Sequence, residues 1–269
     1  LDDDVVRAIV QQLLNEKRMA EEARRDAENA TRSKTQFFAA ASHDLRQPLQ
    51  AIGIYVSLLK KRAQGPLEPL VNNLATAVES LSKLVEELLE ISRLDSGAIL
   101  PRVDQILLDD LFTLLEQEFT PLSASKGLSL RVRRSGFAID SDPLLLQRVI
   151  RNLLANAIRY TQRGGVLLAA RPRGGLISLE IWDTGPGIRQ GELDRIFEEF
   201  YRGESSKADN SGAGFGLGLS IVERIARVLN HKVELRSISG EGSRFSVEVP
   251  VSAAALAKTD RRDEPRADP

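Results

Sequence analysis

The stretch NLLANAIRYT, residues 152–161, has apolar residues at helical spacing and two asparagines on one side. Asn152 and Asn156 are four residues apart, so their amides share one helix face, with Arg159 and Tyr160 just beyond. Amide oxygens can ligate a hard cation such as Mg²⁺, which takes its other ligands from water and substrate phosphates. Two helical asparagines are more often structural than functional, so the rest of the chain must decide what this helix does.

From about residue 98 onward, β-rich runs alternate with segments of helical spacing. The apolar spacing predicts helices over 108–126, 142–160 and 217–230. Strands are predicted over 128–134, 165–171, 176–183, 232–237 and 243–249. This mixture predicts an α+β sandwich in which the helices cover one face of a mixed sheet.

The preceding part of the chain predicts a helical hairpin. An apolar seam runs through one helix, breaks at AQGPLEP (63–69), and restarts in a second helix that ends near residue 97. The seam residues are Leu45, Leu49, Ile52, Val56 and Leu59, then Leu70, Leu74, Ala77, Leu81, Leu84, Leu88 and Ile91. One hairpin cannot cover both apolar stripes, so we expect two copies to pair as a four-helix bundle. Residues 1–35 are either a solvated helix or a coiled coil.

Composition excludes several classes of protein. The 37 basic and 38 acidic residues nearly cancel, which argues against nucleic acid or an anionic membrane as partner. The chain has no cysteine, which excludes disulfides and thiolate metal sites and fits a reducing cytoplasmic compartment. No apolar run approaches the roughly 20 residues that span a bilayer. The chain does not begin with Met, so we expect a fragment, and we expect residues 251–269 to be a disordered tail or linker.

His43 is one of two histidines in the chain. On a helical wheel it lies opposite the apolar seam, so its ring points outward, where another domain could reach it. Asp44 is adjacent, and the amide of Gln47 lies one turn further on the same face. A lone exposed histidine is usually an ordinary surface residue. A functional role for His43 therefore depends on the motifs in the rest of the chain.

Two glycine-containing segments complete the pattern. DTGPGI (183–188) ends a predicted strand with Asp183, whose carboxylate could accept from an exocyclic amine such as that of adenine. GAGFGLGLSIV (212–222) places glycines before an apolar helix, where free N–H groups and the helix dipole favour phosphates. Either segment alone is weak evidence, because turns and flexible loops have similar compositions.

Together with IFEEFYR (196–202), these segments resemble the sensor histidine kinases of two-component systems in order and spacing. SHDLRQPL is similar to the phospho-acceptor H box, and the other four segments are similar to the N, G1, F and G2 boxes. The resemblance covers residues 36–250. It implies a dimerisation and histidine-phosphotransfer hairpin over 36–97 and a catalytic ATP-binding domain of the GHKL, or Bergerat, fold over 98–250.

The resemblance also implies roles for individual residues. His43 would accept the γ-phosphoryl group of ATP, Asp44 would orient or deprotonate its ring, and Gln47 would belong to the same catalytic face. Asn156 would ligate Mg²⁺. The expected ATP-binding residues are Asn152, Asn156, Arg159, Tyr160, Asp183, Gly185, Gly187, Arg202, Gly214, Gly216, Leu217 and Gly218.

The implied partners are a second copy of the chain and the receiver domain of a response regulator, with no nucleic acid and no membrane contact in this fragment. The fragment would be cytoplasmic, and an upstream sensor could anchor the full-length protein.

Several positions depart from the family's commonest pattern. Gln47 stands where Thr or Asn is usual, which leaves phosphatase activity open. Arg159 replaces a common lysine and presents a planar fork instead of a point charge. Phe215 replaces a small residue of the lid, and Phe197 and Phe200 are expected to pack the lid. His231, in a helix-to-strand turn, is expected to be structural or exposed.

Three other functions fit part of the same sequence pattern. An ATPase of the gyrase or mismatch-repair type needs a glutamate one turn before the Mg²⁺ ligand, but Asn152 stands there and cannot act as a base. A non-catalytic dimeric scaffold is disfavoured because the expected polar residues are present. A protein acting mainly as a phosphatase would remove phosphate from a phosphorylated regulator.

Overall fold

The computed structural model describes residues 11–12, 15–19, 21, 25, 45, 47–203 and 215–252. His43, Asp44 and Gly214 lie outside these residues. The chain divides into two compact units, residues 1–98 and 99–269, and each is treated separately below. Among the described residues, no helix combines the length and the apolar character needed to cross a bilayer.

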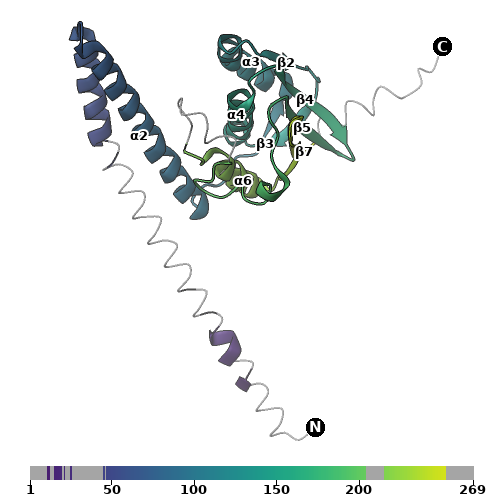
Figure 1. Ribbon diagram of the computed structural model, residues 1–269. Coiled ribbons are helices and arrows are strands. Elements are labelled where there is room, and N and C mark those ends of the chain that lie inside the picture. The colour runs from purple at the N-terminus through teal and green to yellow at the C-terminus, as the bar shows by residue number, and fades with distance from the viewer. Residues whose placement is uncertain are drawn as a thin grey trace, which may run out of the picture. The chain divides into compact units, whose positions relative to one another are not determined.

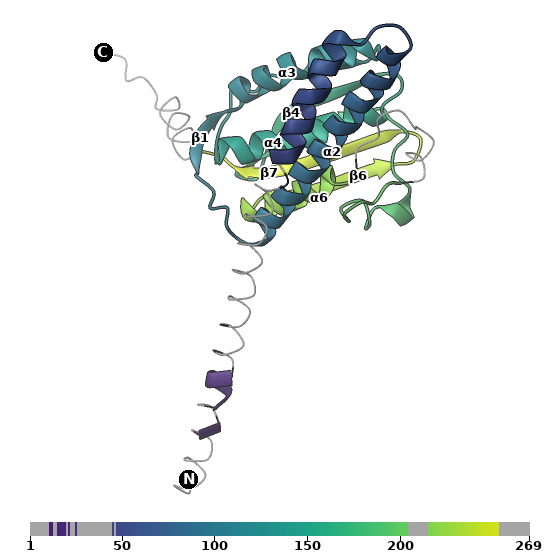
Figure 2. The same cartoon turned by 90° about the vertical axis from the view of Figure 1, so that its left-hand side faces the viewer.

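The first unit contains the predicted helical hairpin (Figures 1 and 2). One helix includes residues 47–62, and α2 spans Leu67–Asp95. Gly65 has a φ of +61°, in the left-handed region that favours glycine, and Pro66 is the N-cap of α2. The turn between the two helices is therefore made by residues 63–66, and the rest of the AQGPLEP segment, including Pro69, forms the first turn of α2.

Much of the hairpin's apolar surface is exposed within one chain. Val56, Leu89, Ile91 and Leu94 are buried. The exposed large apolar residues of the hairpin are Leu45, Ile52, Ile54, Tyr55, Leu58, Leu59, Leu67, Leu70, Leu74, Leu81 and Leu88. So large an uncovered apolar face is typical of a surface that pairs with another helical element.

The second unit is the predicted α+β sandwich. Its helices are α3 (Leu108–Ser125), α4 (Pro143–Tyr160) and α6 (Gly218–Val228), with a short 3-10 turn, η1 (Gln190–Glu192). Its strands are β1 (Asp104–Leu107), β2 (Ser129–Val132), β3 (Ala138–Ser141), β4 (Gly165–Arg173), β5 (Leu176–Asp183), β6 (Lys232–Ile238) and β7 (Gly242–Pro250). The main sheet has the order β2-β4-β5-β7-β6, in which β2 and β4 are parallel and the other pairs antiparallel. The fold class predicted from the sequence is confirmed.

The strands β1 and β3 were not predicted. They form a separate antiparallel pair of four residues each, with Ile106 opposite Ile139. Each strand is too short to display an alternating pattern, and each carries polar residues at one end.

The helices α3, α4 and α6 lie on one face of the main sheet (Figure 1). The residues of α4 that are buried at helical spacing are Leu146, Val149, Ile150, Leu153, Leu154, Ala157 and Ile158. This stripe fixes the rotation of α4, so the positions between its members, which include Asn152 and Asn156, lie at the margin of the core.

Both ends of α4 are held by side chains: its own N-cap residue at the start, and a lysine that follows α3 at the end. At its start, Asp142 accepts hydrogen bonds from the backbone N–H groups of Leu144 and Leu145, each at 3.0 Å. Its second oxygen accepts from the N–H of Arg102 at 2.8 Å. At its end, the Lys126 ammonium donates to the carbonyls of Ile158 and Arg159 at 3.0 and 2.7 Å. Such caps satisfy terminal backbone groups and typically contribute about 1 kcal/mol each.

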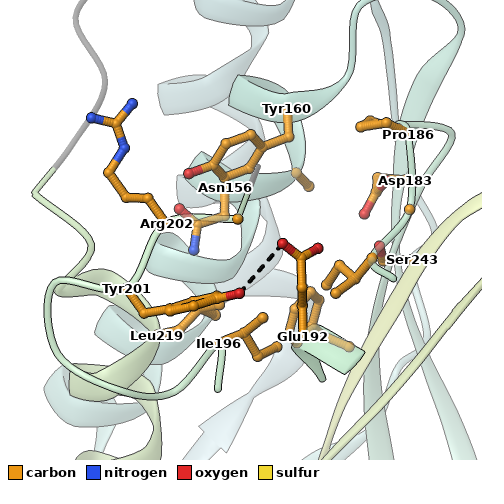
Figure 3. Close-up of a pocket in the computed structure, with 15 residues that line it drawn as sticks. Asn156, Tyr160, Asp183, Pro186, Glu192, Ile196, Tyr201, Arg202, Leu219 and Ser243 are labelled. Carbon is orange, nitrogen blue, oxygen red and sulfur yellow. Dashed lines mark hydrogen bonds between the residues drawn. The ribbon is translucent and has the colours of Figure 1, made fainter. Parts of the chain in front are cut away.

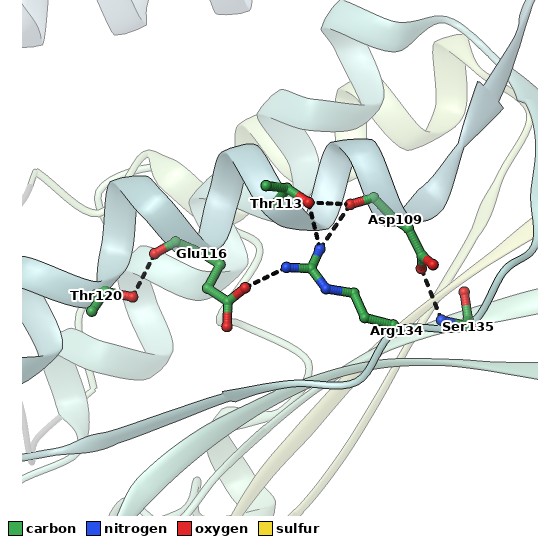
Figure 4. A network of polar contacts seen from close by, with 6 residues as sticks. All are labelled: Asp109, Thr113, Glu116, Thr120, Arg134 and Ser135. Atoms are coloured by element: carbon green, nitrogen blue, oxygen red, sulfur yellow. Dashed lines mark hydrogen bonds and ion pairs between the residues drawn. The ribbon is translucent and has the colours of Figure 1, made fainter.

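A polar network joins α3 to the connection between β2 and β3 (Figure 4). The guanidinium of Arg134 donates to the Asp109 carbonyl at 2.8 Å and the Thr113 hydroxyl at 2.6 Å, and pairs with Glu116. The Asp109 carboxylate accepts from the N–H of Ser135 at 2.8 Å. These contacts hold the connection against the first turns of α3.

Candidate functional site

A pocket opens between α4, the end of β5, the segment that follows it and the start of α6 (Figure 3). It is lined by Asn156, Ala157, Tyr160, Asp183, Pro186, Gly187, Ile188, Glu192, Ile196, Tyr201, Arg202, Gly203, Leu219, Ser243 and Phe245. Apolar walls with a few polar groups suit a flat heteroaromatic ligand that carries a polar edge.

Asp183 is the last residue of β5 and lies in this pocket. Its Oδ1 accepts a hydrogen bond from the N–H of Gly185 at 2.8 Å. Burial raises the pKa of this carboxyl, while backbone hydrogen bonds from Gly185 and Ser243 partly oppose that rise. A carboxylate in an apolar wall is a strong acceptor for an amine on the ligand.

The two asparagines of α4 meet the start of α6. Asn156 lines the pocket, and the Asn152 amide donates to the carbonyl of Arg148 at 3.0 Å. A Cβ built on Gly218, the first residue of α6, would lie 3.5 Å from Asn152 Oδ1 and 3.7 Å from Asn156 Nδ2. The fold therefore brings three of the predicted ATP-binding residues together.

The start of α6 has no side-chain cap. Its N-cap is Leu217, which is fully buried and cannot accept hydrogen bonds through its side chain. The first-turn N–H groups of a helix have no partners within the helix. They can serve an anionic ligand, and the helix dipole favours one there.

Two glycines among the expected ATP-binding residues are also required by packing. A Cβ on Gly187, whose φ is +66°, would lie 2.0 Å from the carbonyl oxygen of Ile238. A Cβ on Gly216, whose φ is +79°, would lie 2.8 Å from the carbonyl oxygen of Tyr201. A side chain at either position would push apart segments that form the pocket.

The other predicted residues are placed as follows. Tyr160 and Arg202 line the pocket, whereas Arg159, Gly185 and Gly218 do not. Gln47 is exposed on the helix of the hairpin.

His231 is half-buried, as expected of a structural residue. Its Nε2 lies 2.8 Å from the Ser141 hydroxyl, and burial lowers the pKa of its ring.

Several pocket residues were not predicted. Ile196, Leu219 and Phe245 form apolar walls, but their spacing cannot distinguish a pocket wall from the core. Glu192 and Tyr201 are also new: the Tyr201 hydroxyl donates to Glu192 Oε1 at 3.3 Å. Tyr201 lies in the segment IFEEFYR, which resembles a motif of the family, but no sequence pattern pointed to Glu192.

Family models match both units of the chain. A model described as "Histidine kinase-, DNA gyrase B-, and HSP90-like ATPase" matches residues 141–253. A model described as "His Kinase A (phospho-acceptor) domain" matches residues 33–97. The chain belongs to the sensor histidine kinases. Phospho-acceptor domains of this kind dimerise and partner response regulators in general, and the ATPase match supports ATP binding by the second unit.

Relatives and solved structures agree with this assignment. The chain is 31% identical over 264 residues to the autoinducer 2 sensor kinase/phosphatase LuxQ of Vibrio cholerae, covering 94% of this chain and 30% of LuxQ. It is 31% identical over 232 residues to the sensor histidine kinase RcsC of Escherichia coli, covering 85% of this chain and 24% of RcsC. This sensor kinase chain therefore spans less than a third of these two relatives.

Among solved structures, full-length ShkA in complex with AMPPNP superposes with a TM-score of 0.72 at 29% identity, covering 82% of this chain and 46% of ShkA. The Acinetobacter baumannii histidine kinase AdeS has a TM-score of 0.58 at 23% identity, covering 78% of this chain and 98% of AdeS, which supports the fold.

Proposed function

We propose that this chain is a protein-histidine kinase that transfers the γ-phosphoryl group of ATP to His43 and then to an aspartate of a response-regulator receiver domain. The observation that carries the proposal is the pocket in which Asp183, Asn156 and the start of α6 converge. The same chain carries a hairpin that matches a phospho-acceptor domain.

Asp183 is proposed to bind the adenine edge. Its carboxylate would accept from the exocyclic amine, and the apolar side chains of Ile188 and Leu219 would contact the ring faces. Burial raises the pKa of Asp183. A bound amine that donates to the carboxylate would oppose this rise, because it stabilises the ionised form.

The phosphates are proposed to lie at the start of α6, where the uncapped N–H groups and the helix dipole favour negative charge. Asn156 fits a Mg²⁺ ligand, because its amide is a neutral oxygen donor in the pocket and lies near Gly218. Bound Mg²⁺ would neutralise phosphate charge and orient the phosphoryl group. Arg202, which lines the same pocket on the side of Asn156, would contribute a second positive charge.

At His43, a neutral ring nitrogen would attack the γ-phosphorus while the bond from phosphorus to the oxygen of ADP breaks. The ring gives up a proton as the N–P bond forms, and Asp44 is the proposed acceptor or orienting group. The phosphoryl group would then pass from the ring nitrogen to the carboxylate of the receiver. The exposed apolar residues of the hairpin support a homodimeric four-helix bundle as the setting for both steps.

Changing Asn156 to aspartate is expected to lower labelling from γ-labelled ATP by about 100-fold, because a group that stabilises charge in transfer contributes on this scale. The added carboxylate would stand beside the phosphates. Labelling should be measured with the oligomeric state by light scattering, and the dimer should be retained. Unchanged labelling would show that residue 156 does not face the phosphates, and loss of the dimer would mean that the substitution acts through the fold.

A second proposed activity is dephosphorylation of the regulator. LuxQ is named a sensor kinase/phosphatase, and the Gln47 amide is exposed on the hairpin, where it could position a water molecule. Changing Gln47 to alanine is expected to slow loss of phosphate from a phosphorylated receiver by about 100-fold while autophosphorylation continues. Equal rates with and without Gln47 would contradict this role.

A further inference from the structure

The pocket contains a second carboxylate that the family resemblance did not identify. Glu192, at the end of η1, points its carboxylate toward the pocket centre (Figure 3). In that view it lies between Asp183 on one side and Asn156 and Arg202 on the other. All four residues line the same pocket.

Tyr201 contacts this carboxylate, and Arg195 and Gly203 shape its surroundings. The Tyr201 hydroxyl donates to Glu192 Oε1 at 3.3 Å, and the Arg195 guanidinium lies 4.5 Å from the centre of the Tyr201 ring. Burial and, to a smaller extent, the nearby Glu192 charge raise the pKa of Tyr201. Its hydroxyl therefore stays protonated and can donate. A Cβ on Gly203 would lie 3.1 Å from Oε1 and 3.4 Å from Oε2 of Glu192, so glycine there leaves room for the carboxylate.

The position of Glu192 relative to its neighbours indicates which part of a nucleotide it meets. In a nucleotide, the ribose connects the base to the phosphates. If Asp183 binds the base, and Asn156 and the start of α6 serve the phosphates, a group between them faces the ribose. A carboxylate at the phosphates would repel them, whereas a carboxylate at the ribose meets two hydroxyl donors.

We propose that Glu192 accepts hydrogen bonds from the 2′- and 3′-hydroxyls of the nucleotide ribose, so that the pocket selects ribonucleotides over deoxyribonucleotides. A carboxylate has about four acceptor positions, so it can bind the diol while Tyr201 occupies one of them. This inference rests on the proposed binding of ATP and adds a specificity residue to that site.

The test compares dissociation constants of ADP, 2′-deoxy-ADP and 3′-deoxy-ADP, measured calorimetrically on the full chain with Mg²⁺. ADP is used because it is not consumed by phosphoryl transfer. The wild type is expected to bind ADP at least about 10-fold more tightly than either deoxy analogue, since a hydrogen bond to a charged group is worth this much or more. Glu192→Ala is expected to bring both ratios close to one.

Two matched variants separate the carboxylate from its surroundings. Tyr201→Phe removes the donor to Glu192 but keeps the carboxylate, so most of the preference for ADP should remain. Glu223→Ala removes a carboxylate from the surface of α6, where it pairs with Arg227, and should leave both ratios unchanged. If Glu192→Ala binds no nucleotide, the same comparison is made with Glu192→Gln. In that variant the preference for ADP over each deoxy analogue should be smaller than in the wild type.

The outcomes distinguish this inference from the proposed function. If the wild type binds no adenine nucleotide, the proposed function and this inference both fail. If ADP binds but the deoxy analogues bind equally well, the role of Glu192 is wrong and ATP binding stands. The same conclusion follows if the preference persists in Glu192→Ala, or in Glu192→Gln where that variant decides.

Discussion

Replacing His43 by alanine is expected to reduce labelling of the chain by γ-labelled ATP to background, a loss of at least about 1,000-fold, because the variant lacks the nucleophile. The second histidine cannot substitute for it. His231 is half-buried at the end of α6, and its Nε2 contacts Ser141. The measurement is incorporation of label in the presence of Mg²⁺ at neutral pH.

The control for this variant is nucleotide binding. His43 lies in the unit formed by residues 1–98, and the pocket lies in the other unit, so His43→Ala should bind ADP with the affinity of the wild type. Label on His43→Ala equal to that on the wild type would place the acceptor elsewhere. Loss of ADP binding would show instead that the substitution disturbs the fold.

Replacing Asp183 by asparagine is expected to weaken ADP binding by roughly 10- to 100-fold, because the charged acceptor for the adenine amine is lost. An asparagine would also present an NH₂ group that cannot accept from that amine. Calorimetric titration measures this change. Asp194→Asn, at an exposed position outside the pocket, is a matched control that should bind as the wild type does. Unchanged affinity in Asp183→Asn would contradict the proposed contact with adenine.

The same substitution should not destabilise the protein without nucleotide. Because burial raises the pKa of Asp183, the folded state binds the proton more tightly than the unfolded state does. The stability contributed by this residue is therefore greatest at low pH and is lost as the pH rises through the raised pKa. At neutral pH the ionised carboxylate is a cost, so Asp183→Asn should unfold at an equal or higher urea concentration. Fluorescence of Trp182, the single tryptophan, reports unfolding of this unit.

Much of the α+β fold could be predicted because its longer strands and helices show the spacing of apolar residues that is typical of each. The predicted strand over 176–183 has the bounds of β5, and the predicted helix over 142–160 begins one residue before α4. The strands β1 and β3 could not be predicted, because their pairing depends on contact between two four-residue segments of mixed polarity far apart in sequence. The hydrogen bonds between these strands leave no recognisable pattern in the sequence of either one.

Without the family resemblance, the sequence points to site residues where polar side chains interrupt an apolar pattern. Asp183 at a strand end and Asn156 on a helix stand out in this way, and the structure places both in one pocket. Leu219 and Phe245 could not be identified, since apolar residues look alike whether they line a pocket or fill the core. Glu192 lies in a polar turn, and only the fold brings it to Tyr201.

The most direct test of the proposed kinase is to locate the phosphoryl group after incubation with ATP and Mg²⁺. Peptides of the wild type should be analysed at neutral to basic pH by mass spectrometry that preserves phosphoramidate bonds. A single phosphoryl group on His43, lost in acid and stable in base, is the predicted result. An acid-stable phosphoryl group on a serine or threonine, or an unmodified His43, would contradict the account.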